Sequence, residues 1–135
     1  MADPAIHRPF SVLVIEDEPD LVFFLARTFE SIRGQVTTAV DGLDALRKVE
    51  SCAPFDLVLL DLGLPRMDGR EFLERLHRIS PETSVIISTG YTPSFTQDEA
   101  KRFVAVLSKP YGMDELISVT KQALRRFAPA PKTNL

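Results

Sequence analysis

The chain has 135 residues, a net charge of −3 and a pI of about 5.4, with 44% hydrophobic and 26% charged residues. This is the composition of a globular protein, and its acidic balance excludes a basic surface for nucleic acid or for an anionic membrane. The single cysteine excludes an internal disulfide, and no apolar run approaches the roughly 20 residues of a membrane span. The N-terminus has no signal-peptide pattern, so we expect one cytoplasmic domain.

Apolar strands alternate with amphipathic helices along the sequence. Strands are predicted over 10–16, 35–40, 55–61, 84–89 and 104–108, and helices over 19–32, 41–51, 68–79, 96–103 and 112–127. This alternation predicts an α/β fold of the flavodoxin-like (βα)5 type, a doubly wound parallel sheet in strand order 2-1-3-4-5. We expect a single domain over 10–127, an N-terminal tail over 1–9 and a flexible C-terminal tail over 128–135.

Acidic residues lie at the ends of two of the predicted strands. Glu16 ends the first predicted strand and Asp17 follows it, and Asp61 ends the third. These strands are neighbours in the expected order, so their carboxylates meet in one pocket at the carboxyl edge of the sheet. Crowded carboxylates repel each other, and a hard divalent cation with oxygen ligands would relieve that repulsion.

Four pieces of the sequence, each at a strand exit, resemble the receiver domain of two-component response regulators, the family of the chemotaxis regulators. They are Glu16-Asp17, Asp61 in the run Asp-Leu-Gly-Leu-Pro-Arg-Met-Asp-Gly, Thr89 after the fourth strand, and Lys109-Pro110 after the fifth. The resemblance implies that Asp61 is the phosphoryl acceptor. It also implies that Thr89 donates its hydroxyl to a phosphoryl oxygen.

The resemblance further implies a Mg²⁺ ion and a lysine ammonium at this site. Mg²⁺ would be bound by the carboxylates of Asp17 and Asp61 and by the backbone carbonyl of Gly63, with Glu16 acting through a bound water. Lys109 would place its ammonium against Asp61 and the incoming phosphoryl group. Members of the family often have a cis peptide before the proline that follows this lysine, and the sequence leaves that isomer open.

Two features bear on how such a domain would signal. Receiver domains usually carry Tyr or Phe three residues before the lysine, and this chain has Val106 there. Tyr91 and Phe103 are therefore further switch candidates, and we expect the switch to run through the loop 89–96. In the first predicted helix, Phe23 is an apolar ring on the polar face, where it is either a docking residue for the phosphohistidine domain or a harmless exposed aromatic.

The expected function is that of a single-domain response regulator. It would accept a phosphoryl group onto Asp61 from a phosphohistidine of a histidine kinase or histidine phosphotransfer protein, and would then act on an unknown downstream protein or in a phosphorelay. It would assist its own phosphorylation and dephosphorylation without being an enzyme in the usual sense. The short tails favour this over a receiver domain cut from a hybrid histidine kinase.

Two other interpretations of the sequence remain. One is a Mg²⁺-dependent phosphatase of the haloacid dehalogenase type with an aspartyl-phosphate intermediate. Such enzymes need Asp-x-Asp after the first strand, where this chain has Glu16-Asp17-Glu18. The other is a structural pseudo-receiver, which predicts no affinity for Mg²⁺.

Overall fold

The computed structural model describes residues 6, 8–52, 54–63, 68–91 and 93–125. Its ten elements alternate along the chain: β1 (Phe10–Ile15), α1 (Pro19–Ser31), β2 (Gly34–Ala39), α2 (Gly42–Ser51), β3 (Leu57–Asp61), α3 (Gly69–Ile79), β4 (Ser84–Thr89), α4 (Gln97–Ala100), β5 (Ala105–Ser108) and α5 (Met113–Arg125). The strands pair in parallel in the order β2-β1-β3-β4-β5, so the predicted fold and strand order are confirmed. The more polar β2 lies at an edge, as buried strands are the apolar ones.

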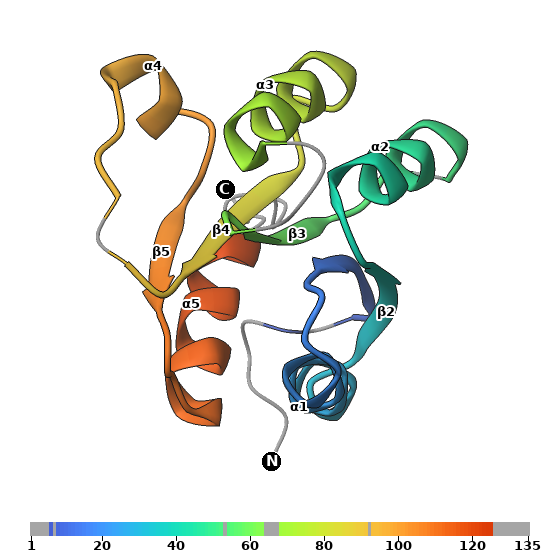
Figure 1. Cartoon of the computed structure of the whole chain (residues 1–135). Helices are drawn as coiled ribbons and strands as arrows, with labels where there is room; N and C mark the ends of the chain where they lie inside the picture. Colours follow the sequence, from blue (N-terminus) through green and yellow to red (C-terminus); the bar gives the residue numbers. More distant parts are fainter. Residues whose placement is uncertain (1–5, 7, 53, 64–67, 92, 126–135) are drawn as a thin grey trace, which may run out of the picture.

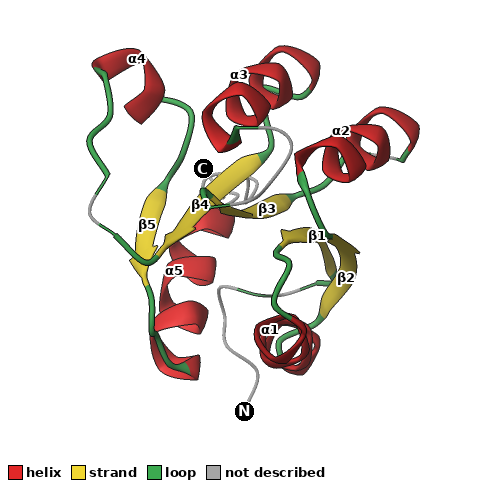
Figure 2. Cartoon of the chain, in the orientation of Figure 1, coloured by secondary structure: helices red, strands yellow, loops and turns green. Residues whose placement is uncertain are grey.

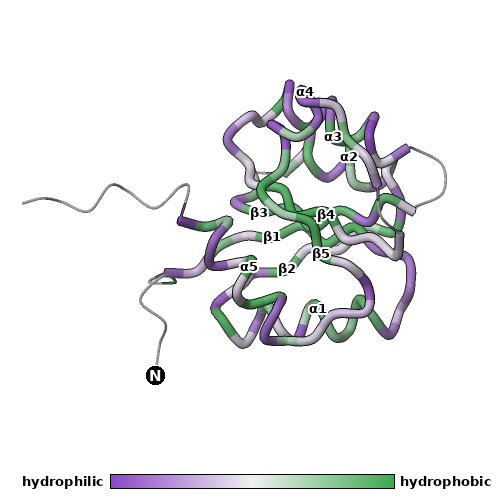
Figure 3. Tube along the Cα trace, turned by 90° about the vertical axis from the view of Figure 1, so that its left-hand side faces the viewer, coloured by the Kyte–Doolittle hydropathy of each residue, from purple (hydrophilic) through white to green (hydrophobic). Residues whose placement is uncertain are grey.

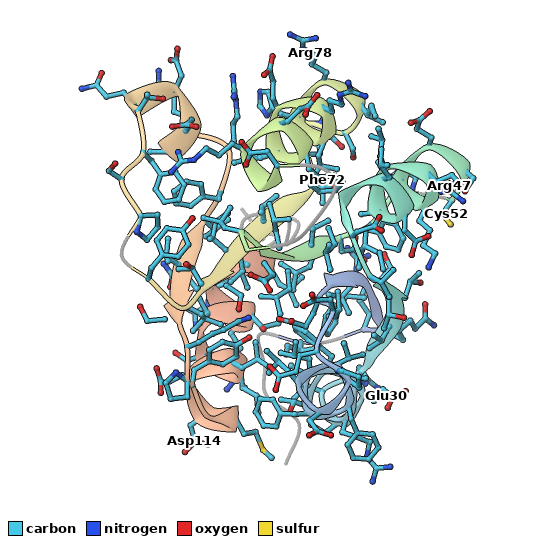
Figure 4. The ribbon with its side chains drawn as sticks, viewed as in Figure 1. Glu30, Arg47, Cys52, Phe72, Arg78 and Asp114 are labelled. Carbon is cyan, nitrogen blue, oxygen red and sulfur yellow. The ribbon has the colours of Figure 1, made fainter. Side chains whose placement is uncertain are left out.

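Helices cover both faces of the sheet (Figures 1 and 2). Successive strand residues point to opposite faces, and two apolar cores result. One core lies under α2 and α3 and includes Phe72, which Figure 4 shows on the sheet side of α3 while Arg78 points away. The other lies under α1 and α5 and includes Phe29 and Leu116. Figure 3 shows the same division, with hydrophobic strands between helices that carry the hydrophilic residues.

The first helix has the orientation that its periodicity predicts. Leu25 and Phe29 are buried against the sheet, whereas Phe23 is 66% exposed on the opposite face. The helix is followed by Arg33, whose φ of 77° lies in the left-handed region, and then by Gly34. A Cβ on Gly34 would lie 2.8 Å from the backbone oxygen of Phe29, so glycine is required here by close packing rather than by its φ angle.

Several element boundaries differ from the predicted ones. The predicted helix over 96–103 is the single turn α4, which ends at Ala100, because Phe103 turns inward and packs against the core under α2 and α3. Strand β3 begins at Leu57 rather than at Phe55. Ile6 is buried in the core under α1 and α5, although it lies in the segment predicted as an N-terminal tail. Residues 126–135, which include the predicted C-terminal tail, lie outside the described residues.

The peptide bond between Lys109 and Pro110 is cis. Across the described part of the chain, every helix is too short or too polar to cross a membrane.

Candidate functional site

The carboxyl edge of the sheet brings the exits of β1 and β3 together. Ile15 pairs with Leu60, which places Glu16 beside Asp61 at the next position of the ladder. Because side chains alternate across a strand, both carboxyl groups project to the face covered by α1 and α5. Both residues are buried, with 2% and 7% of their surface exposed. The fold therefore holds two acids side by side in a poorly solvated position.

The ammonium of Lys109 lies between these two acids. Its Nζ donates a hydrogen bond of 3.0 Å to Glu16 Oε1 and one of 3.1 Å to Asp61 Oδ2. The lysine follows β5 and its side chain remains 25% exposed, so it is less buried than the two acids that it bonds. The sequence indicated the neighbourhood of Lys109 and Asp61, but not the bond to Glu16.

Backbone N–H groups orient the two carboxylates. Glu16 Oε2 accepts hydrogen bonds of 3.1 Å from the backbone nitrogens of both Asp17 and Glu18. Asp61 Oδ1 accepts one of 2.9 Å from the nitrogen of Gly63. Each carboxylate thus uses one oxygen for Lys109 and the other for the turn that follows its own strand. The geometry of the pocket is therefore set by the strand exits themselves.

Burial and charge shift the protonation equilibria of the pocket. Burial raises the pKa of Glu16, and the negative charge of Asp61 adds to the rise, while the bond from Lys109 partly offsets it. Burial alone would lower the pKa of Lys109, but the hydrogen bonds and charges of Glu16 and Asp61 outweigh burial and raise it. Lys109 therefore stays cationic at neutral pH and supplies a permanent positive charge beside Asp61.

The pocket also has the donor set of a site for a hard cation. Glu16, Asp17 and Asp61 each offer a carboxylate oxygen, and these oxygens all lie within 4.8 Å of one another. Mg²⁺ binds oxygen at roughly 2.0–2.1 Å, so two of its ligands lie at most about 4.2 Å apart. The three oxygens therefore lie somewhat farther apart than the direct ligands of one ion, and Glu16 is predicted to act through a bound water. The exposed Asp17 stands at the mouth of the pocket, and the carbonyl of Gly63 remains a predicted ligand.

Comparison of the sequence with known protein families agrees with this arrangement of residues at the ends of the strands. The sequence model of the response regulator receiver domain matches residues 12–121. The chain belongs to the response regulator receiver domain family. Receiver domains act in two-component signalling and bind Mg²⁺ at an acidic pocket of this kind.

The similar proteins include some in which the matched receiver domain makes up nearly the whole chain. Sporulation initiation phosphotransferase F of Bacillus subtilis is 35% identical over 120 residues, which cover 87% of this chain and 93% of that protein. The receiver protein CpdR of Brucella abortus is 31% identical over 115 residues, covering 84% and 95%. The transcriptional regulatory protein GlrR of Escherichia coli is 32% identical over 126 residues, which cover 92% of this chain but only 28% of that protein.

Solved receiver domains have the same fold. The CheY-like receiver domain from Methanospirillum hungatei superposes with a TM-score of 0.77 at 25% identity, covering 87% of this chain and 94% of that one. The chemotaxis regulator CheY4 of Vibrio cholerae gives a TM-score of 0.76 at 25% identity, covering 85% and 98%. The receiver fold therefore extends over nearly the whole of the described chain.

Thr89 lies at the end of β4 and is buried, but its hydroxyl is engaged away from Asp61. Thr89 Oγ1 accepts a hydrogen bond of 3.2 Å from the nitrogen of Tyr91 and donates one of 3.3 Å to the oxygen of the same residue. The side chain of Tyr91 is 55% exposed. The other two switch candidates differ in environment: Val106 is 40% exposed on β5, whereas Phe103 packs against Phe95 with ring centroids 4.6 Å apart.

A polar pair beside the pocket was missed from the sequence. Ser88 pairs with Asp61 in the sheet, and its buried hydroxyl lies 3.1 Å from the hydroxyl of Tyr111. Burial raises the pKa of Tyr111, and the bond to Ser88 and the charge of Lys109 partly offset this rise. The alternation of side chains along β4 could have indicated this position, because it places Ser88 on the same side of the sheet as Asp61.

Proposed function

We propose that Asp61 of this receiver domain accepts a phosphoryl group from a phosphohistidine of a histidine kinase or histidine phosphotransfer protein. Mg²⁺ would be held by the carboxylates of Asp17 and Asp61 and by the backbone carbonyl of Gly63, with Glu16 acting through a bound water. The observation that carries the proposal is the position of the Lys109 ammonium, 3.1 Å from Asp61 Oδ2, within a cluster of three carboxylates.

The transfer exchanges one bond to phosphorus for another. A carboxylate oxygen of Asp61 forms the new P–O bond, the P–N bond to the phosphohistidine breaks, and its electron pair returns to the imidazole nitrogen. The main barrier is repulsion between a carboxylate and an anionic phosphoryl group. Lys109 bonds Glu16 and Asp61 with two of its three N–H groups, and the third remains to donate to a phosphoryl oxygen as it approaches. Mg²⁺, when bound, supplies additional positive charge to the attacking and transferring oxygens.

Thr89 would complete the site by donating its hydroxyl to a phosphoryl oxygen. In the arrangement described above this hydroxyl donates to the backbone oxygen of Tyr91, so that bond has to break first. The proposed signal is the resulting movement of the segment after β4. This mechanism uses Tyr91 rather than Val106 as the residue that reports phosphorylation.

The nature of the partners is also a proposal. The similarity to sporulation initiation phosphotransferase F, which extends over 93% of that protein, supports a role as an intermediate in a phosphorelay or as a single-domain regulator. Phe23, exposed on α1 with the Arg27 guanidinium 5.6 Å from its ring centre, is the proposed docking residue for the phosphohistidine domain.

Incubation with acetyl phosphate and Mg²⁺, followed by intact-mass measurement, tests this function. We expect the wild-type chain to gain the mass of one phosphoryl group and Asp61→Asn to gain none. Asp56→Asn is the matched control, because Asp56 is an exposed acid at the opposite end of β3. Phosphorylation of Asp61→Asn, or no binding of Mg²⁺ by calorimetry, would contradict the proposal. Sustained turnover of a generic phosphate ester would instead indicate a phosphatase.

A further inference from the structure

Arg70, the second residue of α3, attaches the segment that follows β4 to α3. Its Nη1 donates hydrogen bonds of 3.0 Å to both carboxylate oxygens of Glu99 in α4. Its Nη2 donates one of 2.8 Å to the backbone oxygen of Ser94. The guanidinium also lies over the ring of Phe95, 4.8 Å from its centre. We call this set of contacts the Arg70 clamp.

The clamp positions a helix that is too short to be stable alone. Helix α4 has four residues, and a single helical turn is not stable without tertiary support. Its start is closed by a capping box, in which Thr96 N donates to Glu99 Oε1 at 2.9 Å and Glu99 N donates to Thr96 Oγ1 at 3.1 Å. Because Glu99 serves both the cap and Arg70, the guanidinium fixes where α4 sits.

The clamp joins the two segments that leave the proposed phosphorylation site. On one side, α3 begins against the acceptor strand: a Cβ on Gly69 would lie 2.9 Å from Leu62 Cδ2 and 3.2 Å from Leu62 Cα. Leu62 is the residue after Asp61. On the other side, the clamped segment begins three residues after Tyr91, whose backbone holds the hydroxyl of Thr89.

We infer that Arg70 is a positioning residue that opposes the phosphorylated arrangement of the segment after β4. This inference rests on the proposed function, in which the hydroxyl of Thr89 leaves the backbone of Tyr91. The displaced backbone then pulls on Ser94, which Arg70 holds in place. Weakening the clamp lowers the free energy needed for this movement, and by linkage it tightens the binding of any phosphoryl analogue that requires it.

Arg70→Met tests the inference, because methionine keeps an apolar chain against Phe95 and removes the guanidinium. Binding of beryllofluoride with Mg²⁺, followed by fluorine NMR, is expected to tighten by about 5-fold or more. Glu99→Gln keeps an oxygen for the capping box, weakens the clamp, and is expected to tighten binding to a smaller extent. Arg75→Met is the matched control: it removes an exposed arginine of the same helix, paired with Glu71, and leaves the affinity unchanged.

The possible results separate the inference from the proposed function. Unchanged or weaker binding by Arg70→Met overturns the inference while leaving the function of Asp61 intact. Failure of the wild-type chain to bind beryllofluoride, or binding that survives Asp61→Asn, overturns both. If Arg70→Met does not fold, Glu99→Gln decides, and an affinity equal to that of Arg75→Met overturns the inference.

Discussion

The ammonium of Lys109 donates a hydrogen bond of 3.0 Å to Glu16, which stands 93 positions earlier in the chain. The same nitrogen lies 3.1 Å from Asp61, so a single cation bridges two buried acids from two neighbouring strands. The hydrogen bond to Glu16 holds the ammonium of Lys109 next to Asp61. In the proposed reaction Glu16 thus helps to hold the positive charge of Lys109 beside the acceptor Asp61.

Lys109→Met should slow phosphorylation by acetyl phosphate. A hydrogen bond to a charged group is worth about 1.5–3 kcal/mol, which corresponds to a fall in rate of about 10- to 150-fold. The rate of mass gain at saturating Mg²⁺ measures the effect. Lys101→Met, which changes an exposed lysine just after α4, should keep the wild-type rate. A wild-type rate in Lys109→Met would remove the lysine from the mechanism.

Glu16→Gln should stabilise the fold at neutral pH in the absence of divalent ions. Because the pKa of Glu16 is raised above its usual 4.5, the native state binds a proton at this group more tightly than the unfolded state does. The contribution of Glu16 to stability is therefore largest below pH 4.5 and falls as the pH rises through the folded pKa. The variant lacks this fall, so its advantage in urea unfolding should vanish in acid and grow towards neutral pH. Glu18→Gln, at an exposed neighbour, is the control, and a less stable Glu16→Gln at neutral pH would contradict the prediction.

Tyr111 should ionise above the usual pKa of tyrosine, because burial raises the pKa of its hydroxyl above 10.0. The chain has two tyrosines, so the absorbance titration of Tyr91→Phe reports Tyr111 alone. The stabilisation that Tyr111 provides is complete below pH 10 and is lost as the pH rises through its folded pKa. Tyr111→Phe should accordingly weaken the alkaline fall in unfolding free energy. A titration of Tyr111 that is the same in native and in urea-unfolded protein would contradict this.

Gly34→Ala should destabilise the fold by about 1–3 kcal/mol, the usual cost of forcing a methyl group into a packed site. The new Cβ would lie 2.8 Å from the backbone oxygen of Phe29, which cannot rotate away. Gly112→Ala is the matched control, because a Cβ there meets no atom within 4 Å. Urea unfolding of the two variants compares them directly, and equal midpoints would show that the contact at Gly34 is readily relieved.

Phe23→Ala should slow phosphotransfer from a protein donor and leave phosphorylation by acetyl phosphate unchanged. The ring is 66% exposed on α1 and its loss removes apolar contact area without opening the core. Stopped-flow or gel-based transfer from a phosphorylated histidine phosphotransfer protein measures the first rate, and intact mass the second. Equal transfer rates for wild type and variant would assign Phe23 to the surface without a docking role.

The pattern of residues along the chain predicted the sheet and the position of the acidic pocket, because both depend on features of short sequence segments. Apolar runs form buried strands, and the carboxyl ends of parallel strands share one edge, so Glu16 and Asp61 had to end near each other. The ends of helices followed the pattern less closely. Helix α4 stops at Ala100 because Phe103 is drawn into the core beside Phe95, a tertiary contact that periodicity does not contain.

The sequence by itself determined the alternation of strands and helices, the strand order and the set of acids at the strand exits, because these depend on hydrophobic periodicity and chain connectivity. Only the tertiary structure decided which groups meet across elements. Lys109 bonds Glu16, Ser88 bonds Tyr111 and Arg70 bonds Glu99. Each of these contacts depends on side-chain rotamers and on the relative placement of elements remote in the chain, and neither is encoded in a local pattern.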